Sequence, residues 1–454
     1  MRYVSTRGSA PELGFADVLL AGLAVDGGLY VPASWPAMPP LRRDVDYATI
    51  AAAVMAPFVG DDVDMGTLRR ICDDAYATFR HPAVCPLVQI GPDDWLLELF
   101  HGPTLAFKDV ALQVVGRLFD HVLGNRAEHV TIIGATSGDT GSAAIDAVAG
   151  RHNINIVMLY PEGRVSEVQR RQMTTVDAAN VRTVAVEGTF DDCQDLVKAM
   201  FADETFRAEH RLAAVNSINW ARVMSQVVYY ATATVHLGGG SVSFAVPTGN
   251  FGNVLSGWVA RRMGLPIDRL MIGSNRNDIL SRFLHSGIMA TSTVVPTLSP
   301  SMDIQVSSNF ERLLFELNHR DGGMTAEQLH RFRATGSLVV EPDQMDAVTS
   351  VFDAARVDDE TTLAIIADTY DATGVLVDPH TAVGLGAARH YRDRTVPMVT
   401  LATAHPAKFP DAVERATGIR PSLPAHLVDL LDRPERTATL PNDLAKIETF
   451  VAGA

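Results

Sequence analysis

Lysine is rare in this sequence, and its rarity narrows the candidates for one kind of covalent chemistry. Of the 38 basic residues only four are lysines: Lys108, Lys198, Lys408 and Lys446. Arginine stays protonated and cannot form a stable imine with an aldehyde, whereas a deprotonated lysine amine can. If the protein carries a Schiff base, one of these four residues forms it.

Lys108 has the context that best suits such a site. It lies in WLLELFHGPTLAFKDVAL, where a predicted strand leads into a predicted helix, close to the N-terminal end of that helix. A cation is unfavourable beside the positive end of a helix dipole, and partial desolvation disfavours it further, which suits imine chemistry. Lys198 and Lys446 fit ordinary surface lysines better. Lys408, in ATAHPAKFP, stays open as the alternative.

Two glycine-rich segments each join a predicted strand to a predicted helix. They are HVTIIGATSGDTGSAAIDAV at 129–148 and VSFAVPTGNFGNVLSGWVA at 242–260. Free backbone N–H groups and the helix dipole make such a junction an anion site. Neither segment has the GK[ST] of a P-loop or the GxGxxG of a dinucleotide fold. A single turn of this kind often only permits tight turning. Two of them favour a ligand with two anionic ends.

Thr403 is a further candidate because of where it falls. It ends the predicted strand VPMVTLAT, and ligands of open α/β sheets bind beyond the carboxyl ends of the strands. The competing interpretation is a strand-terminating hydroxyl that bonds to the backbone.

The elements that must position these residues form an α/β pattern. From about residue 85, short apolar strands alternate with longer amphipathic helices, which predicts largely parallel sheets. We expect an N-terminal, mostly helical domain over 1–84, a catalytic region of two α/β lobes over 85–420 and a helical C-terminal tail over 421–454.

Composition excludes several classes of protein. The 454 residues are 47% hydrophobic, so the chain is globular, and the net charge of −15 argues against a nucleic-acid scaffold. The sequence has no apolar run of bilayer-spanning length and no secretory signal, and its three cysteines lack metal-site spacing. We therefore expect a cytoplasmic protein with neither a metal nor a membrane partner.

With these segments assembled, the chain resembles the threonine synthases, in their long form with an N-terminal extension. The resemblance runs to about residue 420 and consists of seven blocks in the family's order. These are DGGLYVP near Gly27, HGPTLAFKD at 101–109, GATSGDTGSAA at 134–144, SINWAR at 217–222, PTGNFGN at 247–253, SMDIQVSSNFER at 301–312 and TAHPAKF at 403–409.

The resemblance implies a pyridoxal-phosphate enzyme of the tryptophan-synthase β-like fold (fold type II). Such an enzyme converts O-phospho-L-homoserine and water to L-threonine and phosphate. Lys108 would be the Schiff-base lysine, and Thr403 would face the pyridine nitrogen. The cofactor phosphate would lie in the loop formed by Gly249, Asn250, Phe251, Gly252 and Asn253. The substrate carboxylate would lie in the TSGDTG loop, with Thr136, Ser137, Asp139 and Thr140.

A third anion, the substrate phosphate, needs donors of its own. The candidates are Asn219 and Arg222 in SINWAR and Arg164 in PEGRVS. Related sequences often carry lysine at the position of Arg164, so the charge is kept there and the geometry differs. The resemblance also implies that Lys108 moves protons during a β,γ-replacement, and that the protein is a monomer or a weak homo-oligomer.

Three other functions stay open at this point. A threonine or serine dehydratase, or a phospholyase, would share the fold, and a dehydratase would not need the phosphate donors. A nicotinamide-dependent dehydrogenase could use the same turns, but the ribose-binding fingerprint is missing. A non-enzymatic homologue would more readily have lost Lys108 or the GNFGN loop.

Overall fold

The computed structural model describes residues 1–214, 217–391, 393 and 395–453. It consists of two compact units, unit 1 with Met1–His101 and Ser217–Pro421, and unit 2 with Gly102–Asn216 and Ser422–Ala454. The chain therefore passes between the units after residues 101, 216 and 421. These divisions follow packing, which local sequence patterns do not encode, and the predicted domain boundaries at 84/85 and 420/421 stay predictions.

Unit 1 is built on a six-stranded sheet in the order β13-β10-β9-β14-β4-β3. All neighbouring strands are parallel except β3 and β4. The strands are β3 (Leu87–Gln89), β4 (Asp94–Glu98), β9 (Val242–Pro247), β10 (Ile267–Ser274), β13 (Phe352–Arg356) and β14 (Met398–Ala402).

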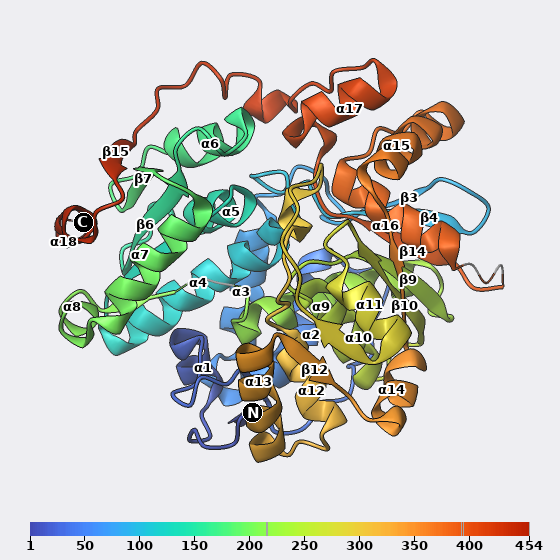
Figure 1. Ribbon diagram of the computed structural model, residues 1–454, viewed down its shortest axis with the longest axis horizontal. Coiled ribbons are helices and arrows are strands. Elements are labelled where there is room, and N and C mark those ends of the chain that lie inside the picture. Colours follow the sequence, from blue (N-terminus) through green and yellow to red (C-terminus); the bar gives the residue numbers. More distant parts are fainter. Residues whose placement is uncertain (215–216, 392, 394, 454) are drawn as a thin grey trace. The chain divides into compact units, whose positions relative to one another are not determined.

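Helices cover both faces of this sheet, as two close approaches to β10 show. A Cβ at Gly257 of α10 (Gly252–Arg262) would come within 2.8 Å of Leu270, and a Cβ at Gly273 would come within 2.9 Å of the carbonyl of Val383 in α16 (Pro379–His390). Leu270 and Gly273 are three residues apart on one strand and so face opposite sides. Figure 1 shows α16 running beside β9, β10 and β14.

The N-terminal residues pack into unit 1 around Trp220, at the start of α9 (Trp220–His236). Its ring lies against Tyr3, Trp35 and Phe58, with centroids 5.6–6.1 Å apart. The N-terminal elements are β1 (Tyr3–Ser5), α1 (Phe15–Ala21), β2 (Tyr30–Pro32), α2 (Tyr47–Val59), η1 (Gly60–Asp62) and α3 (Met65–Tyr76).

Two further groups of elements complete unit 1. The first follows β10 and contains α11 (Ile279–Ser286), β11 (Ile288–Ala290), η2 (Pro300–Met302), α12 (Phe310–Leu317), α13 (Gly322–Thr335), β12 (Ser337–Val339) and α14 (Pro342–Thr349). The second contains α15 (Asp359–Thr373), η3 (Pro406–Lys408) and α17 (Pro410–Thr417).

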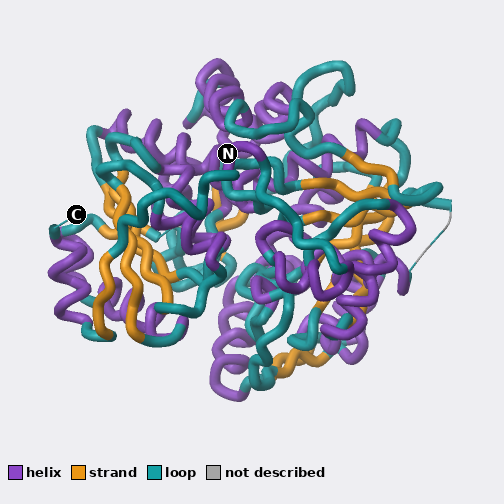
Figure 2. Tube along the Cα trace, turned by 90° about the horizontal axis from the view of Figure 1, so that it is seen from above, coloured by secondary structure: helices purple, strands orange, loops and turns teal. Residues whose placement is uncertain are grey.

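Unit 2 is built on a five-stranded, wholly parallel sheet in the order β15-β7-β6-β5-β8. Figure 2 shows its strands side by side near the C-terminus. The elements are α4 (Lys108–Arg126), β5 (Val130–Ala135), α5 (Asp139–Val148), β6 (Ile154–Pro161), α6 (Glu167–Thr174), β7 (Val181–Glu187), α7 (Phe190–Ala202), α8 (Glu204–Glu209), β8 (Leu212–Ala213), η4 (Ala425–Leu427), β15 (Ala438–Pro441) and α18 (Leu444–Ala452).

This second sheet is also covered on both faces. Ile132 of β5 borders a small void together with Leu112 of α4 and Ala147 of α5. The next residue, Ile133, belongs to a separate apolar cluster with α7 and with Ile447 of α18. Because successive side chains of a strand point to opposite faces, α4 and α5 cover one face, and α7 and α18 the other.

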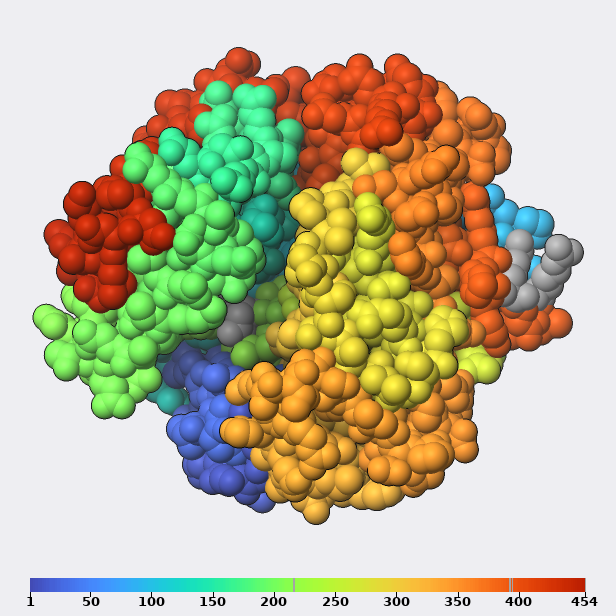
Figure 3. Space-filling model, in the orientation of Figure 1, coloured from blue at the N-terminus to red at the C-terminus, as the bar shows by residue number. Residues whose placement is uncertain are grey.

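The C-terminal tail differs from the purely helical segment that the sequence predicts. Residues 438–441 form β15, which extends the sheet in parallel beside β7, and α18 then packs on α7. Figure 3 shows the C-terminal residues, in red, lying against the green surface of α7. A four-residue strand carries too weak a pattern to be recognised without its partner. No helix among the described residues combines the length and the apolar character that crossing a bilayer requires.

Candidate active site

Lys108 is the first residue of α4, and its side chain contacts α5, the helix that packs beside α4 in unit 2. Its side chain is buried, and its Nζ donates to Oδ2 of Asp139 at 3.3 Å. Asp139 is the first residue of α5, and its Oδ1 accepts from Nε2 of Gln169 at 2.8 Å. The candidate lysine and the TSGDTG loop, treated separately in the sequence, thus meet at one point.

The loop before Lys108 is held in place by its neighbour, Asp109. The carboxylate of Asp109 is fully buried and accepts from the backbone N–H of Thr104 at 2.8 Å and from its hydroxyl at 2.6 Å. Gly102 is needed there, because a Cβ would come within 2.5 Å of Asp109. Nε2 of Gln172 donates to the Thr104 carbonyl at 3.0 Å. The lysine therefore begins its helix from a rigid turn.

The TSGDTG loop is organised by Thr136. Its hydroxyl accepts from the N–H groups of Gly138 at 3.0 Å and Gly141 at 2.9 Å. Gly138 has φ +138°, and a Cβ at Gly141 would come within 2.4 Å of Thr136, so both positions require glycine. The N-cap of α5, Gly138, has no side chain to cap the helix, and the positive end of the helix dipole in this loop favours an anion. Ser137 is exposed and Thr140 half-buried.

Two features of the 249–253 loop in unit 1 are typical of a loop that binds phosphate. The backbone at Gly249 packs closely against a neighbouring segment, and the turn at Phe251 has an uncommon backbone conformation. A Cβ at Gly249 would lie 2.7 Å from the carbonyl oxygen of Ser301. Phe251 precedes α10 with φ +62°, an uncommon conformation for a non-glycine residue, and its buried ring packs on Phe310 and Phe352. No side chain caps α10 in the described part of the chain. The helix N–H groups again face no intrahelical acceptor.

Two residues from the segment before α12 fix the backbone of this loop. Oγ of Ser307 donates to the Gly249 carbonyl at 2.7 Å, and Nδ2 of Asn309 donates to the Asn250 carbonyl at 3.0 Å. Because both carbonyls are tied to this supporting segment, they are not left to repel an anion held by the N–H groups.

Asn253 carries a buried donor that the described residues do not satisfy. Its Oδ1 accepts from the hydroxyls of Tyr229 and Tyr230, and the Tyr230 hydroxyl also donates to its carbonyl at 2.9 Å. Two donors on Oδ1 fix the orientation of the amide, and Nδ2 is then left without a partner among the described residues. A buried unsatisfied donor is costly, so a ligand acceptor at Nδ2 accounts for it.

Thr403 directly follows β14 and is buried, and its hydroxyl makes no hydrogen bond to a described residue. The strand-terminating interpretation required such a bond to the backbone and is not supported. Lys408 lies in the same segment, fully buried at the end of η3. Burial therefore does not separate Lys408 from Lys108. The observation in favour of Lys108 is its contact with Asp139 of the TSGDTG loop.

The residues of SINWAR have two different roles in the structure. Asn219 caps α9: its Oδ1 accepts from the N–H of Ala221 at 3.0 Å, and its Nδ2 donates to the Leu19 carbonyl at 2.8 Å. Both ends of this amide are thus used by the fold. Arg222, one turn into the helix, is buried, and its Nε and Nη1 have no partner among the described residues. Burial lowers the pKa of Arg222 to about 10, and the group stays charged near neutral pH.

Arg164 is exposed, in the loop after β6, and its backbone N–H donates to the Pro161 carbonyl at 3.3 Å. Its side chain makes no hydrogen bond or ion pair with the described residues, although its charge helps to lower the pKa of Asp192. Its side chain therefore has none of the constraint that marks Arg222. The structure gives it no feature that favours a phosphate-binding role over that of a surface charge.

Several residues that hold the site residues in place have no role that the sequence alone predicts. Gln169 orients Asp139, Tyr229 and Tyr230 orient Asn253, and Ser307 and Asn309 fix the 249–253 loop. Ser307 and Asn309 belong to the SMDIQVSSNFER block, which was a signal for them. The glutamine and the tyrosines gave no comparable signal.

Fold and site together define a class of protein. The two largely parallel α/β sheets, the buried lysine at a helix start and the anion loops are those of a fold-type-II pyridoxal-phosphate enzyme. The family model described as "Pyridoxal-phosphate dependent enzyme" matches residues 87–339. Models described as "Threonine synthase N terminus" and "Threonine synthase, C-terminal" match residues 2–76 and 381–451. The chain belongs to the threonine synthase family.

Similar proteins cover the chain from end to end. A threonine synthase of Pseudomonas aeruginosa is 54% identical, over 100% of this chain and 98% of its own length. The crystal structure of a PLP-bound threonine synthase from Brucella melitensis has a TM-score of 0.98 and 52% identity, covering 100% of this chain and 99% of the other. The crystal structure of threonine synthase from yeast has a TM-score of 0.95 and 38% identity, covering 99% of this chain and 98% of the other. The predicted family, fold and cofactor are confirmed.

The residues present fit this cofactor. An aldehyde needs a lysine held in place, and a phosphate needs converging donors. Lys108 supplies the first. The start of α10, the close approach at Gly249 and the unsatisfied Nδ2 of Asn253 supply the second.

Proposed function

We propose that this threonine synthase converts O-phospho-L-homoserine and water to L-threonine and phosphate with Lys108 as its Schiff-base and proton-transferring residue. The observation that carries this assignment is the contact between Nζ of Lys108 and Asp139, 3.3 Å away at the start of α5. It ties the only buried lysine of unit 2's described residues to the loop proposed for the substrate carboxylate.

The proposed cofactor contacts follow from the donors that the fold leaves unused. The N–H groups at the start of α10 and Nδ2 of Asn253 bind the cofactor phosphate. The hydroxyl of Thr403 would lie at the pyridine nitrogen, where a neutral group would stabilise a protonated ring less than a carboxylate would. When bound, the cofactor supplies the electron sink that stabilises negative charge on the substrate carbons.

The substrate carboxylate is proposed to bind to the backbone N–H groups of the TSGDTG loop and to the hydroxyls of Ser137 and Thr140. The hydroxyl of Thr136 already accepts from Gly138 and Gly141, so Thr136 shapes the loop. The side chain of Asp139 is an anion and would repel the substrate carboxylate. Its role is to hold Lys108.

Arg222 is the proposed donor for the substrate phosphate. A buried guanidinium with two unsatisfied nitrogens is costly unless an anion binds there, and Arg is well suited to bidentate phosphate contacts. Asn219 supports it indirectly, since it caps the helix and its carbonyl accepts from the N–H of Arg222 at 3.1 Å. Arg164 is retained as a second, weaker candidate for the same anion.

In the reaction, Lys108 removes the proton at the substrate Cα and later returns one there. In between, a proton is lost from Cβ and phosphate leaves from Cγ. Cγ then takes up a proton to become the methyl group, and water adds its hydroxyl at Cβ while its own proton leaves with the phosphate. The balance is one water consumed and one phosphate released. Arg222 holds the phosphate until the Cγ–O bond breaks.

We also propose a cytoplasmic location and a monomer or weak homo-oligomer. All three cysteines are buried and unpaired, as expected in a reducing compartment. The oligomeric state rests on the family resemblance, and sedimentation velocity measures it directly.

A phosphate-release assay tests the proposed function. Wild-type protein should release phosphate from O-phospho-L-homoserine with a far higher kcat/KM than from O-phospho-L-serine, and L-serine should yield no pyruvate. Lys108→Ala should abolish release, and Lys198→Ala, at an exposed lysine, should leave it unchanged. Preferred turnover of L-serine would instead indicate a dehydratase.

A further inference from the structure

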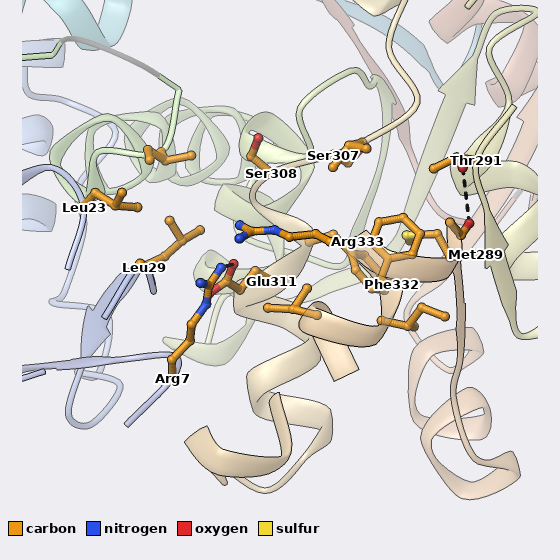
Figure 4. A pocket seen from close by; sticks show the side chains of 17 residues that line it. Arg7, Leu23, Leu29, Met289, Thr291, Ser307, Ser308, Glu311, Phe332 and Arg333 are labelled. Atoms are coloured by element: carbon orange, nitrogen blue, oxygen red, sulfur yellow. Dashed lines mark hydrogen bonds and ion pairs between the residues drawn. The ribbon is translucent and has the colours of Figure 1, made fainter. Parts of the chain in front are cut away.

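A cavity of about 420 Å³ lies within unit 1, and none of the residues proposed above to contact cofactor or substrate lines it. Its walls come mainly from the segments after β1 and after α1, from the start of α12 with the segment before it, and from α13 with β11 and β12. Figure 4 shows side chains from these elements facing a common space. The volume lies in the range of small-molecule sites.

Most of the lining is apolar. Leu29, Met289 and Phe332 are buried at the cavity wall, while Leu23 and Val306 are 45% and 54% exposed. Large exposed apolar side chains beside a buried apolar wall are typical of a surface that another molecule covers. The ligand therefore needs an apolar body.

The charges in the cavity do not cancel. Oε1 of Glu311 accepts from Thr6 at 2.6 Å and from Nε of Arg7 at 3.1 Å, and its Oε2 accepts from Nη2 of Arg7 at 3.1 Å. That carboxylate is satisfied by its own ion pair. Arg333 lines the same cavity, and its guanidinium has no hydrogen-bond or ion-pair partner among the described residues.

The side chain of Arg333 also points into the cavity, as a ligand-binding group must. In Figure 4 its side chain extends across the cavity toward the side that carries Arg7 and Glu311. With Arg7 and Glu311 paired, the lining holds one positive charge, on the exposed Arg333, that no described side chain neutralises. A single carboxylate on the ligand would balance it.

We propose that this cavity binds a small monocarboxylate with an apolar body, whose carboxylate pairs with Arg333. Such a ligand would act on the site assigned above, and this consequence rests on the proposed function. Ser307 lines the cavity and donates to the Gly249 carbonyl, and the ring of Phe310, also in the lining, stacks edge-on to Phe251 at 5.6 Å. A ligand bound in this cavity would therefore contact two residues that hold the 249–253 loop in position.

Calorimetric titration of the holoenzyme with octanoate tests the binding. Octanoate should bind, while octan-1-ol and octylamine, which lack the carboxylate, should bind at least tenfold more weakly. Arg333→Gln should weaken octanoate about 10- to 100-fold, the loss expected for a charge-assisted hydrogen bond. Arg331→Gln is the matched control, because Arg331 lies on the same helix, is exposed and pairs with Glu327 outside the cavity.

A second variant guards against a general effect of removing charge. Val306→Asp, at an exposed position of the rim, should also weaken octanoate because it brings a like charge to the carboxylate. No octanoate binding, or equal affinity in wild type, Arg333→Gln and Val306→Asp, overturns the proposal.

The effect of the cavity ligand on the cofactor site can be measured separately. Bound octanoate should change the rate at which the holoenzyme loses its cofactor, followed by visible absorbance, and Arg333→Gln should remove that change. An unchanged rate with octanoate bound overturns the coupling. These measurements need no turnover, so a failure of the phosphate-release assay is distinguishable from a failure of this site.

Discussion

Lys108 and Asp139 are the first residues of two neighbouring helices, α4 and α5, and their side chains meet with 3.3 Å between Nζ and Oδ2. The helices pack closely enough that a Cβ at Gly116 would come within 2.6 Å of the Ala147 carbonyl. The position of the reactive amine is thus set by helix packing as well as by its own loop.

Asp139→Asn should lower kcat/KM for phosphate release by about 10- to 100-fold, because it replaces a charge-assisted hydrogen bond to Lys108 with a neutral one. The bound cofactor should be retained, since Asn keeps the shape of the side chain. Gln169→Met removes the hydrogen bonds of its side chain with Asp139 and Ser166 but leaves the Asp139 carboxylate beside Lys108, and it should have a smaller effect. Wild-type kcat/KM in Asp139→Asn, with the cofactor bound, would show that this pair does not position the lysine.

Tyr229→Phe should weaken cofactor binding about 2- to 10-fold, because one of the two donors that orient the Asn253 amide is lost. Asn253→Ala should weaken it further, since it removes the unsatisfied Nδ2 itself. Equilibrium dialysis against pyridoxal phosphate measures both. Tyr391→Phe is the control, because within the described part of the chain that hydroxyl accepts from Arg269 alone. A cofactor affinity unaffected by Asn253→Ala would remove this residue from the phosphate site.

Arg222→Met should separate stability from activity. The buried guanidinium has no carboxylate partner among the described residues, so an apolar side chain of similar length should leave the thermal midpoint unchanged or raise it. The KM for O-phospho-L-homoserine should rise by about 10- to 100-fold as a charge-assisted contact is lost. Thermal unfolding and phosphate-release kinetics check the two parts. A fall in the midpoint with unchanged KM would instead mean that Arg222 is structural.

The sequence predicted the features that depend on neighbouring residues. The helix start at Lys108, the glycine turns at 134–144 and 247–253 and the parallel strands all follow from local periodicity and from residues with special backbone freedom. The anion loops were found for the same reason, because a strand, a glycine turn and a helix start occur in one short stretch.

The rest depends on contacts between distant segments. The partnership of Ser307 with Gly249 and the pairing of β15 with β7 join residues far apart in the chain, and no local pattern specifies such pairs. Asn219 shows why the role of a buried polar residue could not be predicted from the sequence. A buried Asn in a functional motif suits a ligand contact or a helix cap equally well from sequence, and only its contacts with Ala221 and Leu19 identify it as the cap.

The central claim is that Lys108 carries the cofactor, and borohydride trapping tests it most directly. Reduction of the wild-type holoenzyme converts the Schiff base to a stable secondary amine, and peptide mass mapping then locates the pyridoxyl group on one of the four lysines. No variant is needed, so folding defects cannot confuse the result. We expect the label on the peptide that contains Lys108. A label on Lys408 would contradict it.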